Sequence, residues 1–382
     1  MSLKVSVCTS LLAICAGGFS AAAQTPAATN QDTASNQGAG TVAYIYLTST
    51  IGSKNQVVGY KAAGNGALSA LPGSPFADNI NSLAANGAWL FGADSTGQKI
   101  DSYAIGANGS LTYKDQYTAT LTGGSLYDLF LDHTGSTLYA VYYTTNNDYL
   151  SQMIDQATGQ LSFVNDLAGG PANNSAVSFI GNNLFAYSSS CYHFGPEIVG
   201  VQRASNGALS YLNDFNPPFP AEKSGGFYCP WLAAADPTNH LVIALTPLNS
   251  NWGQDGSIQL AVYTADSAGN LTTTSTYENM PSVLTTTVNT YWMSPSGKYL
   301  AVGGTGLQIF RMNGANPITK LTGLLTTDTI DKVYWDNANH LYATSYSSNK
   351  LYVFNVTSKG ATEAPGSPHA ITSPSGLVVL PK

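Results

Sequence analysis

A short polar turn followed by a small apolar segment recurs along the whole chain and constrains the fold more than any other feature. Its fullest copy is NGALSALPGSPF, from Asn65 to Phe76. Shorter copies of this cassette are NGSLT from Asn108, TGQLS from Thr158, NGALS from Asn206, AGNLT from Ala268, ANPIT from Ala315 and KGATE from Lys359. Consecutive copies begin between the low forties and about sixty residues apart, near the ~40–50 residues of a four-stranded propeller blade. The seven copies predict an all-β chain folded as a single seven-bladed β-propeller.

The period and the composition both favour one domain. The chain has 382 residues, but the cassette recurs to the C-terminal end, so residues 41–382 are assigned to one propeller. Charged residues make up 9% of the sequence, and glycine occurs 38 times. This composition suits short strands joined by tight turns rather than helices held by ion pairs.

The third repeat shows how a blade is built. YDLFLD (residues 127–132) alternates as an inner strand, and TLYAVYY (residues 137–143) follows as the second strand. The third strand is predicted over residues 149–155, and the outer strand follows the cassette turn over residues 161–167. VAYIYLTS, which opens the first repeat, lacks an inner strand, so we predict that residues 376–380 supply it and close the ring non-covalently.

Recurrent positions in the repeat reduce the number of candidate functional residues. Three histidines fall in the turns between inner and second strands and are interpreted as turn-surface residues: His133, His240 and His340. Three basic residues end third strands and are expected on the solvated rim: Lys61, Arg203 and Arg311. Three inner-strand aromatic residues are interpreted as packing between blades: Trp292, Tyr334 and Trp335.

The N-terminus has the pattern of an export signal. Lys4 precedes an apolar run over residues 5–19 and then three alanines, which predicts a signal peptide over residues 1–23. The alternatives are an uncleaved membrane anchor, for which the run is short, and lipidation at Cys15, where Ile14 departs from the lipoprotein pattern. Residues 24–40 are small and polar and are expected to form a disordered linker. We therefore expect a secreted or periplasmic protein with no membrane span after cleavage.

Charge and cysteine content limit the partners and the chemistry. The formal net charge is −7 and no cluster of Lys or Arg occurs, so no nucleic-acid partner is expected. Removal of the signal leaves Cys191 and Cys229, for which a disulfide is the natural expectation in an oxidising compartment. The alternative is two buried free thiols.

The repeat resembles that of the bacterial lactonase-like, 6-phosphogluconolactonase-type (YVTN-like) seven-bladed propellers. The matching stretches are MSPSGKYLAV from Met293, LYATSYSSNKLYVFNV from Leu341, NGALSALPGSPF from Asn65 and EAPGSPHAITSPSGLVV from Glu363. They extend over essentially the whole mature chain and consist of turns and strands. The enzymatic members carry His, Glu and Arg around the channel mouth, and this chain departs from them because Arg203 and Arg311 map to hairpin ends.

Three long loops of blades four and five are expected on one face of the propeller. They are SSSCYHFGPE (residues 188–197), NPPFPAEKSGGFYCPW (residues 216–231) and TPLNSNWGQDGS (residues 246–257). The expected ligand-binding residues are Tyr192, Tyr228, Trp231, Trp252 and Asp255, with His369 as a further channel-mouth candidate. Aromatic faces that stack on a ring while carboxylates orient it would bind a carbohydrate or another small molecule. The alternative is that these loops are solvated and stapled only for stability.

The function predicted from these features is a binding or interaction module for a carbohydrate, small molecule or protein at the cell envelope. The alternative is a divergent lactone or ester hydrolase on the same face. In that case His193 with Glu197 or Glu222 would act as general base, and Lys223 would stabilise the oxyanion. The sequence has no GxSxG elbow, P-loop or recognised metal-ligand spacing, so we expect no cofactor and no metal.

Overall fold

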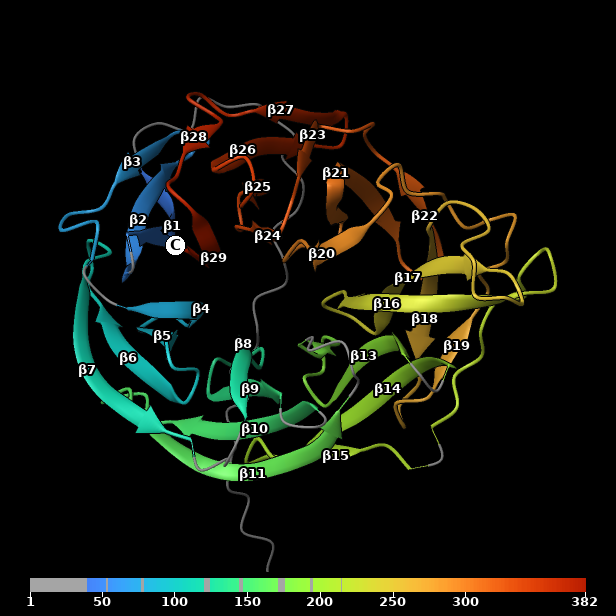
Figure 1. Ribbon diagram of the computed structural model, residues 1–382, viewed down its shortest axis with the longest axis horizontal. Helices are drawn as coiled ribbons and strands as arrows, with labels where there is room; N and C mark the ends of the chain where they lie inside the picture. The colour runs from blue at the N-terminus through green and yellow to red at the C-terminus, as the bar shows by residue number, and fades with distance from the viewer. Residues whose placement is uncertain are drawn as a thin grey trace, which may run out of the picture. The chain divides into compact units, whose positions relative to one another are not determined.

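The computed structural model describes residues 40–52, 54–76, 79–119, 124–143, 147–170, 176–192, 195–213 and 215–382. The predicted signal peptide and the linker up to residue 39 lie outside this part of the chain. The described residues form seven antiparallel sheets around a central channel (Figure 1). The fold is therefore the predicted seven-bladed β-propeller.

Blades one to four each contain four strands, which follow one another from the channel outward. Blade one consists of β29 (Pro374–Pro381), β1 (Thr41–Ile51), β2 (Lys54–Ala63) and β3 (Leu68–Ala70). Blade two consists of β4 (Ile80–Ala85), β5 (Trp89–Asp94), β6 (Lys99–Ile105) and β7 (Leu111–Thr118). Blade three consists of β8 (Ser125–Leu131), β9 (Thr137–Tyr143), β10 (Asn147–Ile154) and β11 (Leu161–Gly170). Blade four consists of β12 (Ser178–Phe179), β13 (Phe185–Tyr192), β14 (Gly195–Arg203) and β15 (Leu209–Tyr211).

Blades five to seven follow the same order with two variations. Blade five consists of β16 (Phe227–Ala235), β17 (His240–Leu248), β18 (Gln259–Ala265) and β19 (Leu271–Thr273). Blade six consists of β20 (Val288–Met293), β21 (Tyr299–Asn313) and β22 (Asn316–Lys320), with β23 (Thr326–Thr329) paired to β21. Blade seven consists of β24 (Lys332–Trp335), β25 (His340–Ser345), β26 (Lys350–Thr357) and β27 (Gly360–Glu363), with β28 (His369–Ala370) paired to β26. The long β21 supplies both the second and the third strand, because the chain reverses near Gly306 (φ 127°) and Met312 N–H reaches the Lys298 carbonyl at 2.9 Å.

Each cassette turn joins the third strand of a blade to its outer strand, as predicted. Every one of these turns has a glycine with positive φ, a conformation that other residues adopt at a cost: Gly66, Gly109, Gly159, Gly207, Gly269, Gly314 and Gly360. Several of these glycines also touch the preceding blade. Tyr139 of β9, for example, donates a hydrogen bond to the Gly207 carbonyl at 2.8 Å. The cassette therefore forms the hairpin and fastens neighbouring blades together.

The ring closes through the C-terminal strand, as predicted. Antiparallel pairing of β29 with β1 runs from Ala43 opposite Pro381 to Ser49 opposite Pro374. Leu377, Val378 and Val379 of β29 are buried against the flanking blades. In Figure 1, β29 lies beside the channel with β1 outside it.

Some turn and hairpin residues are buried, contrary to the sequence interpretation. His340 is only 3% exposed, and its Nδ1 lies 2.7 Å from Asp336 Oδ2, to which Tyr342 also donates at 2.9 Å. Arg203 is also not on a solvated rim: its Nη2 lies 2.8 Å from Asp132 Oδ2, between blades three and four.

The other predicted surface positions show a mixed pattern. Three of them are exposed, as predicted: Lys61, Arg311 and His133. His240 is instead partly buried, and its Nδ1 lies 2.9 Å from Asp236 Oδ2. Arg311 donates to the Ser358 carbonyl of the next blade at 2.5 Å. A place at a hairpin end thus indicates where a residue lies along the strand, but not whether the adjoining blade covers it.

Candidate functional site

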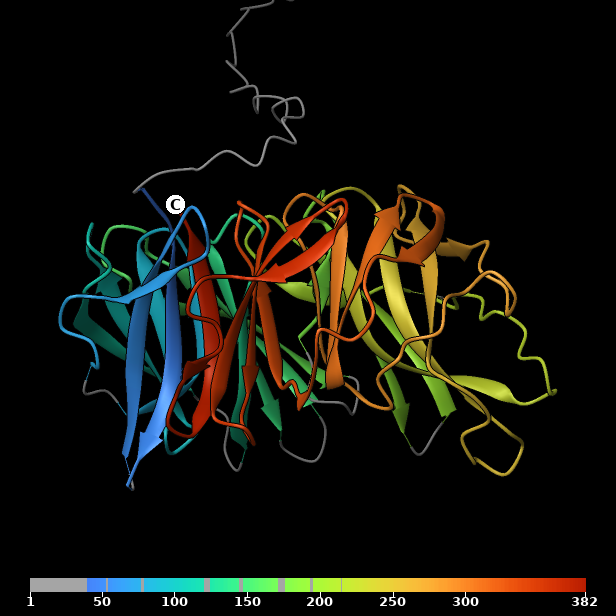
Figure 2. The ribbon, with the colours of Figure 1, turned by 90° about the horizontal axis from the view of Figure 1, so that it is seen from above.

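Two of the three predicted long loops of blades four and five, the β15–β16 and β17–β18 connections, lie on one face of the propeller, as predicted. The prediction of a long loop over residues 188–197 was wrong, because residues 188–192 belong to β13 and residues 195–197 to β14, and the two residues between these strands lie outside the described part. In Figure 2 the connections between second and third strands lie along the lower edge, opposite the cassette turns. Cys191 of β13 and Cys229 of β16 form the expected disulfide, with their Cα atoms 5.2 Å apart. The disulfide joins blades four and five on this face.

A cavity of about 480 Å³ lies beside the disulfide, and we refer to it as the rim cavity. Its lining residues come from blades four, five and six: Cys191, Cys229, Trp231, Thr246, Leu248, Trp252, Gln254, Ile258, Thr286, Thr287 and Val288. Both predicted tryptophans, Trp231 and Trp252, are therefore at one cavity.

The other predicted ligand-binding residues of these loops do not line the rim cavity. Tyr228 is 1% exposed and donates to Gln259 Oε1 at 2.7 Å, so it is a core residue. Asp255 is exposed on the β17–β18 loop. The side chain of Tyr192 lies outside the described part of the structure. His369 is not at the channel mouth, because β28 pairs with β26 away from the inner strand of blade seven, and its ring faces Tyr60 with centroids 6.3 Å apart.

The predicted catalytic residues are not gathered at one point among the described residues. Glu222 accepts hydrogen bonds from the hydroxyl and N–H of Ser224, both at 2.6 Å, and the hydroxyl contact is the main reason that its pKa is lowered. Lys223 lies over the ring of Tyr277, 5.2 Å from the centroid. Glu197 is exposed on β14. His193 lies outside the described residues, so its role stays a prediction.

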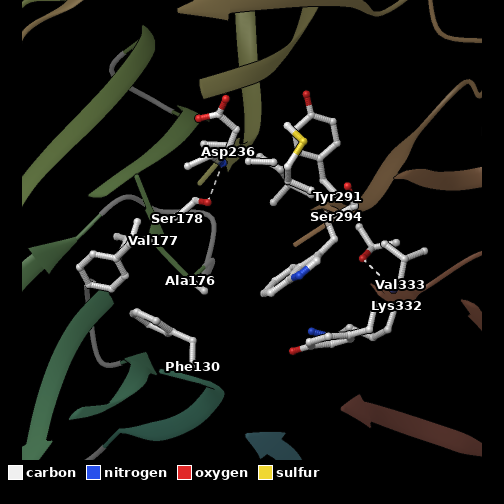
Figure 3. Close-up of a pocket in the computed structure, with 18 of the residues that line it drawn as sticks. Phe130, Ala176, Val177, Ser178, Asp236, Tyr291, Ser294, Lys332 and Val333 are labelled. Carbon is white, nitrogen blue, oxygen red and sulfur yellow. Dashed lines mark hydrogen bonds between the residues drawn. The ribbon is translucent and has the colours of Figure 1, made fainter. Parts of the chain in front are cut away.

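A second cavity, of about 520 Å³, occupies the central channel, and we refer to it as the channel cavity. It is lined by the inner strands of blades three to seven and by the turns that follow several of them. Figure 3 shows Phe130 on one side of it and Lys332 on the other, with Ser178 accepting a hydrogen bond from the Ala235 N–H at 2.8 Å. His133 also lines this cavity, with its ring edge-on to Phe179.

Charged and aromatic side chains meet in the channel cavity. The Lys332 ammonium lies 3.4 Å from Asp128 Oδ2, which links blades seven and three, two blades that are not neighbours in the ring. Trp292 is 39% exposed, and its ring lies against that of Tyr334 with centroids 4.7 Å apart. Trp292 of blade six and Tyr334 of blade seven thus pack between blades, as predicted, and also line the channel cavity. Trp335 is buried, as predicted, and donates to the Trp292 carbonyl at 3.0 Å.

Two phenols beside this ion pair stay protonated at neutral pH. Burial is the main reason that the pKa of Tyr334 is raised, and the charge of Asp128 adds to it. Burial also raises the pKa of Tyr346, with further increases from the charges of Asp331 and Asp128. Burial raises the pKa of the Asp331 carboxyl as well, although the Tyr346 N–H donates to it at 2.7 Å. The Tyr346 hydroxyl already donates to the Ser375 carbonyl at 2.8 Å, so Tyr334, which lines the channel cavity, is the phenol of the two that could donate to a ligand.

The channel-facing residues were missed because β-bulges shift the alternation of the inner strands. Register shifts occur between Leu126 and Asp128 in β8 and between Val288 and Thr290 in β20. Each bulge adds a residue and turns the following side chains to the other face. By contrast, β24 alternates regularly, with buried Val333 and Trp335 set against partly exposed Lys332 and Tyr334. That alternation was a usable sequence signal for blade seven.

Comparison with protein-family models and with curated proteins gave no match. Solved structures do match over the propeller. A proposed 6-phosphogluconolactonase of Bacteroides fragilis aligns with a TM-score of 0.63 and 15% identity, covering 89% of this chain and 98% of the other. The periplasmic gluconolactonase of Pseudomonas aeruginosa has the same TM-score and identity, covering 88% and 99%. A proposed 6-phosphogluconolactonase of Bacteroides uniformis also aligns at 0.63 and 15%, covering 89% and 99%. The chain thus has the fold of the 6-phosphogluconolactonase-like propellers, as the resemblance predicted.

Membrane-spanning helices and metal-binding clusters are both absent from the described ranges. No helix in those ranges is long and apolar enough to cross a membrane. The same part of the chain holds no group of three or more His, Cys, Asp or Glu side chains arranged to bind a metal ion.

Proposed function

We propose that this propeller is a binding protein that holds a small hydroxylated ring compound of the sugar-acid type in the channel cavity. The observation that carries the proposal is the meeting of an exposed indole, Trp292, with the Asp128–Lys332 ion pair in one cavity of about 520 Å³. Ligand sites typically combine apolar or aromatic walls with a few placed polar groups in a volume of about 300–1,000 Å³. The channel cavity meets both conditions.

The side chains define the chemistry of the ligand. The Trp292 ring offers a flat apolar face for a sugar ring, while Asp128 and Asn289, which also lines the cavity, can accept hydrogen bonds from hydroxyl groups. Lys332 is 38% exposed in its side chain, so its ammonium can turn from Asp128 to an anionic group on the ligand. A ring that carries hydroxyls and one carboxylate uses all of these groups.

Calorimetric titration with D-glucuronate, and with D-glucose as its neutral counterpart, tests this proposal. We expect glucuronate to bind more tightly than glucose, and Lys332→Met to remove that preference. Trp292→Ala should weaken binding about tenfold or more, since a stacked aromatic anchor is commonly worth about 2 kcal/mol. Trp252→Ala, at the rim cavity, is the matched control and should leave this binding unchanged. No heat of binding up to about 10 mM glucuronate, or equal affinities for both probes, would count against the proposal.

Lactone hydrolysis is the second candidate function, and the same ion pair favours it. Asp128 would accept a proton from water as the water oxygen bonds to the lactone carbonyl carbon, and Lys332 would stabilise the oxyanion. The ring C–O bond then breaks, and the Asp128 carboxyl returns the proton to the leaving alkoxide, which gives the open hydroxy acid. The fold shared with the Pseudomonas aeruginosa gluconolactonase supports a trial with glucono-1,5-lactone. Asp128→Asn should lower such a rate at least a hundredfold. A rate that is lost instead in His193→Ala and Glu197→Ala would assign the chemistry to the loop residues predicted from the sequence.

We also infer that the protein acts outside the cytoplasm. The support is the disulfide between Cys191 and Cys229 together with the export pattern of residues 1–23. Fractionation of expressing cells should recover the chain in the periplasm or medium, shortened by the signal peptide. Recovery of the full-length chain in the cytoplasm would contradict export.

A further inference from the structure

We propose that the rim cavity is a second ligand site, which takes an uncharged saccharide ring. It is separate from the channel cavity, because the two share no lining residue. At about 480 Å³ it is large enough for a disaccharide. The site does not depend on the proposed function of the channel.

Two indoles provide the apolar surface of this site. Trp231 is 37% exposed and Trp252 is 53% exposed, although both line the same cavity. The Trp231 Nε1 donates to Thr246 Oγ1 at 3.0 Å, which fixes the ring while its face stays open. The Trp252 ring is held edge-on by Phe227, with centroids 4.7 Å apart and planes at 72°. Rigid indoles with open faces bind a ring at a small entropic cost.

The backbone at Trp252 favours a functional reason for this residue. Its φ is 64°, in the left-handed region that glycine and asparagine adopt most readily and a bulky side chain adopts at a cost. The conformation is set by Asn249, whose carbonyl accepts from the Trp252 N–H at 3.0 Å and whose Oδ1 accepts from the Gly253 N–H at 3.0 Å. A turn of this shape would be more stable with asparagine or glycine, so the indole is present against the local conformational preference.

The polar lining of the cavity determines the charge of the ligand. Gln254, Thr286 and Thr287 supply amide and hydroxyl groups, and none of the lining residues is ionisable, since both cysteines are in the disulfide. Gln254 Nε2 donates to the Gly256 carbonyl at 2.8 Å, which orients the amide and leaves its oxygen able to accept. A charged ligand would lose hydration here without gaining a partner of opposite charge. An uncharged ring with hydroxyls at its edge and an apolar face suits these walls.

The disulfide pre-orders the site. It forms part of the cavity wall and ties β13 to β16, the strand that carries Trp231. The Ser189 hydroxyl also hydrogen-bonds to the Trp231 carbonyl, so the backbone of Trp231 is held at two nearby points. Removing the disulfide should therefore weaken binding chiefly by loosening the indole that it positions.

Maltose and cellobiose are the neutral probes for this site, and glucuronate is the charged one. Titration followed by tryptophan fluorescence should show saturable binding of at least one disaccharide at millimolar concentration. Trp252→Asn should weaken it at least tenfold while the thermal midpoint shifts by less than about 3 °C, because asparagine accepts the left-handed backbone. The double variant Cys191→Ser with Cys229→Ser should weaken binding severalfold. Trp292→Ala, which removes the indole of the channel cavity, is the matched control and should leave disaccharide affinity unchanged.

Three results would overturn the second site: no binding of either disaccharide up to about 20 mM, unchanged affinity in Trp252→Asn, or loss of affinity in Trp292→Ala. Loss of disaccharide binding in Trp252→Asn with glucuronate binding intact would separate this site from the one in the channel. Loss of glucuronate binding in Trp292→Ala with disaccharide binding intact would likewise show that the two sites are separate.

Discussion

The carboxylate of Asp132 is fully buried where blade three meets blade four. Its Oδ2 lies 2.8 Å from Arg203 Nη2 and accepts hydrogen bonds from the Thr134 hydroxyl at 2.6 Å and from Asn183 Nδ2 at 3.0 Å. Its Oδ1 accepts the backbone N–H groups of Ser136 and Thr137, each at 3.0 Å. These partners stabilise the buried carboxylate. If one member of the ion pair is removed, the charge that remains is buried without a counter-charge, which lowers the free energy of unfolding.

Asp132→Asn should therefore be more damaging than Arg203→Met. Asp132→Asn leaves the Arg203 guanidinium without a counter-charge, although its side chain is only 11% exposed. The Arg203 Nε has no hydrogen-bond partner even in the unchanged chain. We expect a loss of about 3–5 kcal/mol in the free energy of unfolding. Arg203→Met leaves the carboxylate with its hydrogen bonds from Thr134, Asn183 and the backbone and should cost about half as much. Urea unfolding at pH 7 measures both, and the reverse order would contradict this ranking.

The same carboxylate should contribute to acid sensitivity. Burial alone would raise the pKa of Asp132, but the hydrogen bonds from Thr134, Thr137 and Asn183 and the charge of Arg203 outweigh it, so the pKa is lowered. Its contribution to stability is then complete above about pH 4, the unfolded value, and is lost as the pH falls through the lower folded pKa. Asp132→Asn should show a smaller loss of stability over that acid window than the unchanged chain. Equal slopes would contradict this assignment.

At the residue scale, the sequence predicted places on strands better than it predicted burial. Arg203 and Lys61 both end a third strand, yet the Arg203 side chain is only 11% exposed and pairs with Asp132, whereas Lys61 is exposed. The difference depends on which residue the adjoining blade presents, far away in the sequence. A single repeat contains no information about that contact, so a position common to all blades cannot distinguish the two residues.

At the scale of elements, the cassette turn connects each blade to the one before it. Hydroxyls of second-strand tyrosines donate to turn-glycine carbonyls of the next blade in three cases: Tyr46 to Gly109 at 2.9 Å, Tyr139 to Gly207 at 2.8 Å and Tyr187 to Gly269 at 2.7 Å. The glycines approach so closely that a Cβ on Gly207 would lie 2.5 Å from Thr137 Oγ1. The turn thus needs glycine for its conformation and for the space between blades.

Gly207→Ala should be clearly destabilising for both reasons. It combines a φ of 89° with the contact to buried Thr137, so we expect a loss of about 2–4 kcal/mol. Gly225→Ala is the matched control, because Gly225 has a φ of 78° but no atom within 4 Å of the added Cβ, and should cost about 1 kcal/mol. Urea midpoints of the two variants give the comparison. Equal losses would show that the close approach to blade three contributes nothing.

The elements themselves could be predicted, while the candidate sites could be predicted only in part. Cassette and turn residues have fixed local conformations, so their recurrence predicted the blade order and the closing strand. The rim loops stood out by length, and Trp231 and Trp252 do line one cavity. The channel set was missed because bulges in β8 and β20 change which side chains face inward, and pairing register, not local sequence, determines a bulge.

At the scale of the whole molecule, the closing strand β29 connects the two ends of the repeat series. Removing residues 375–382 would take away nearly all of the pairing with β1 and four buried apolar side chains: Leu377, Val378, Val379 and Leu380. At about 1.5–3 kcal/mol for each side chain, the loss is about 6–12 kcal/mol. This is comparable with the whole stability of a typical domain, about 5–15 kcal/mol. We expect calorimetry of the truncated chain to show no single cooperative transition near the original temperature.

The same truncation can show whether closure or chain length matters. Lys382 alone contributes an N–H bond to the Val42 carbonyl at 2.8 Å and an ammonium 4.5 Å from the Tyr44 ring centroid, so deleting only this residue should lower the midpoint by a few degrees. A synthetic peptide of residues 374–382 should restore part of the transition in the truncated chain, because it can pair with β1 as β29 does. A truncated chain that unfolds cooperatively at the original temperature would mean that blade one is stable with three strands and that the ring needs no closing strand.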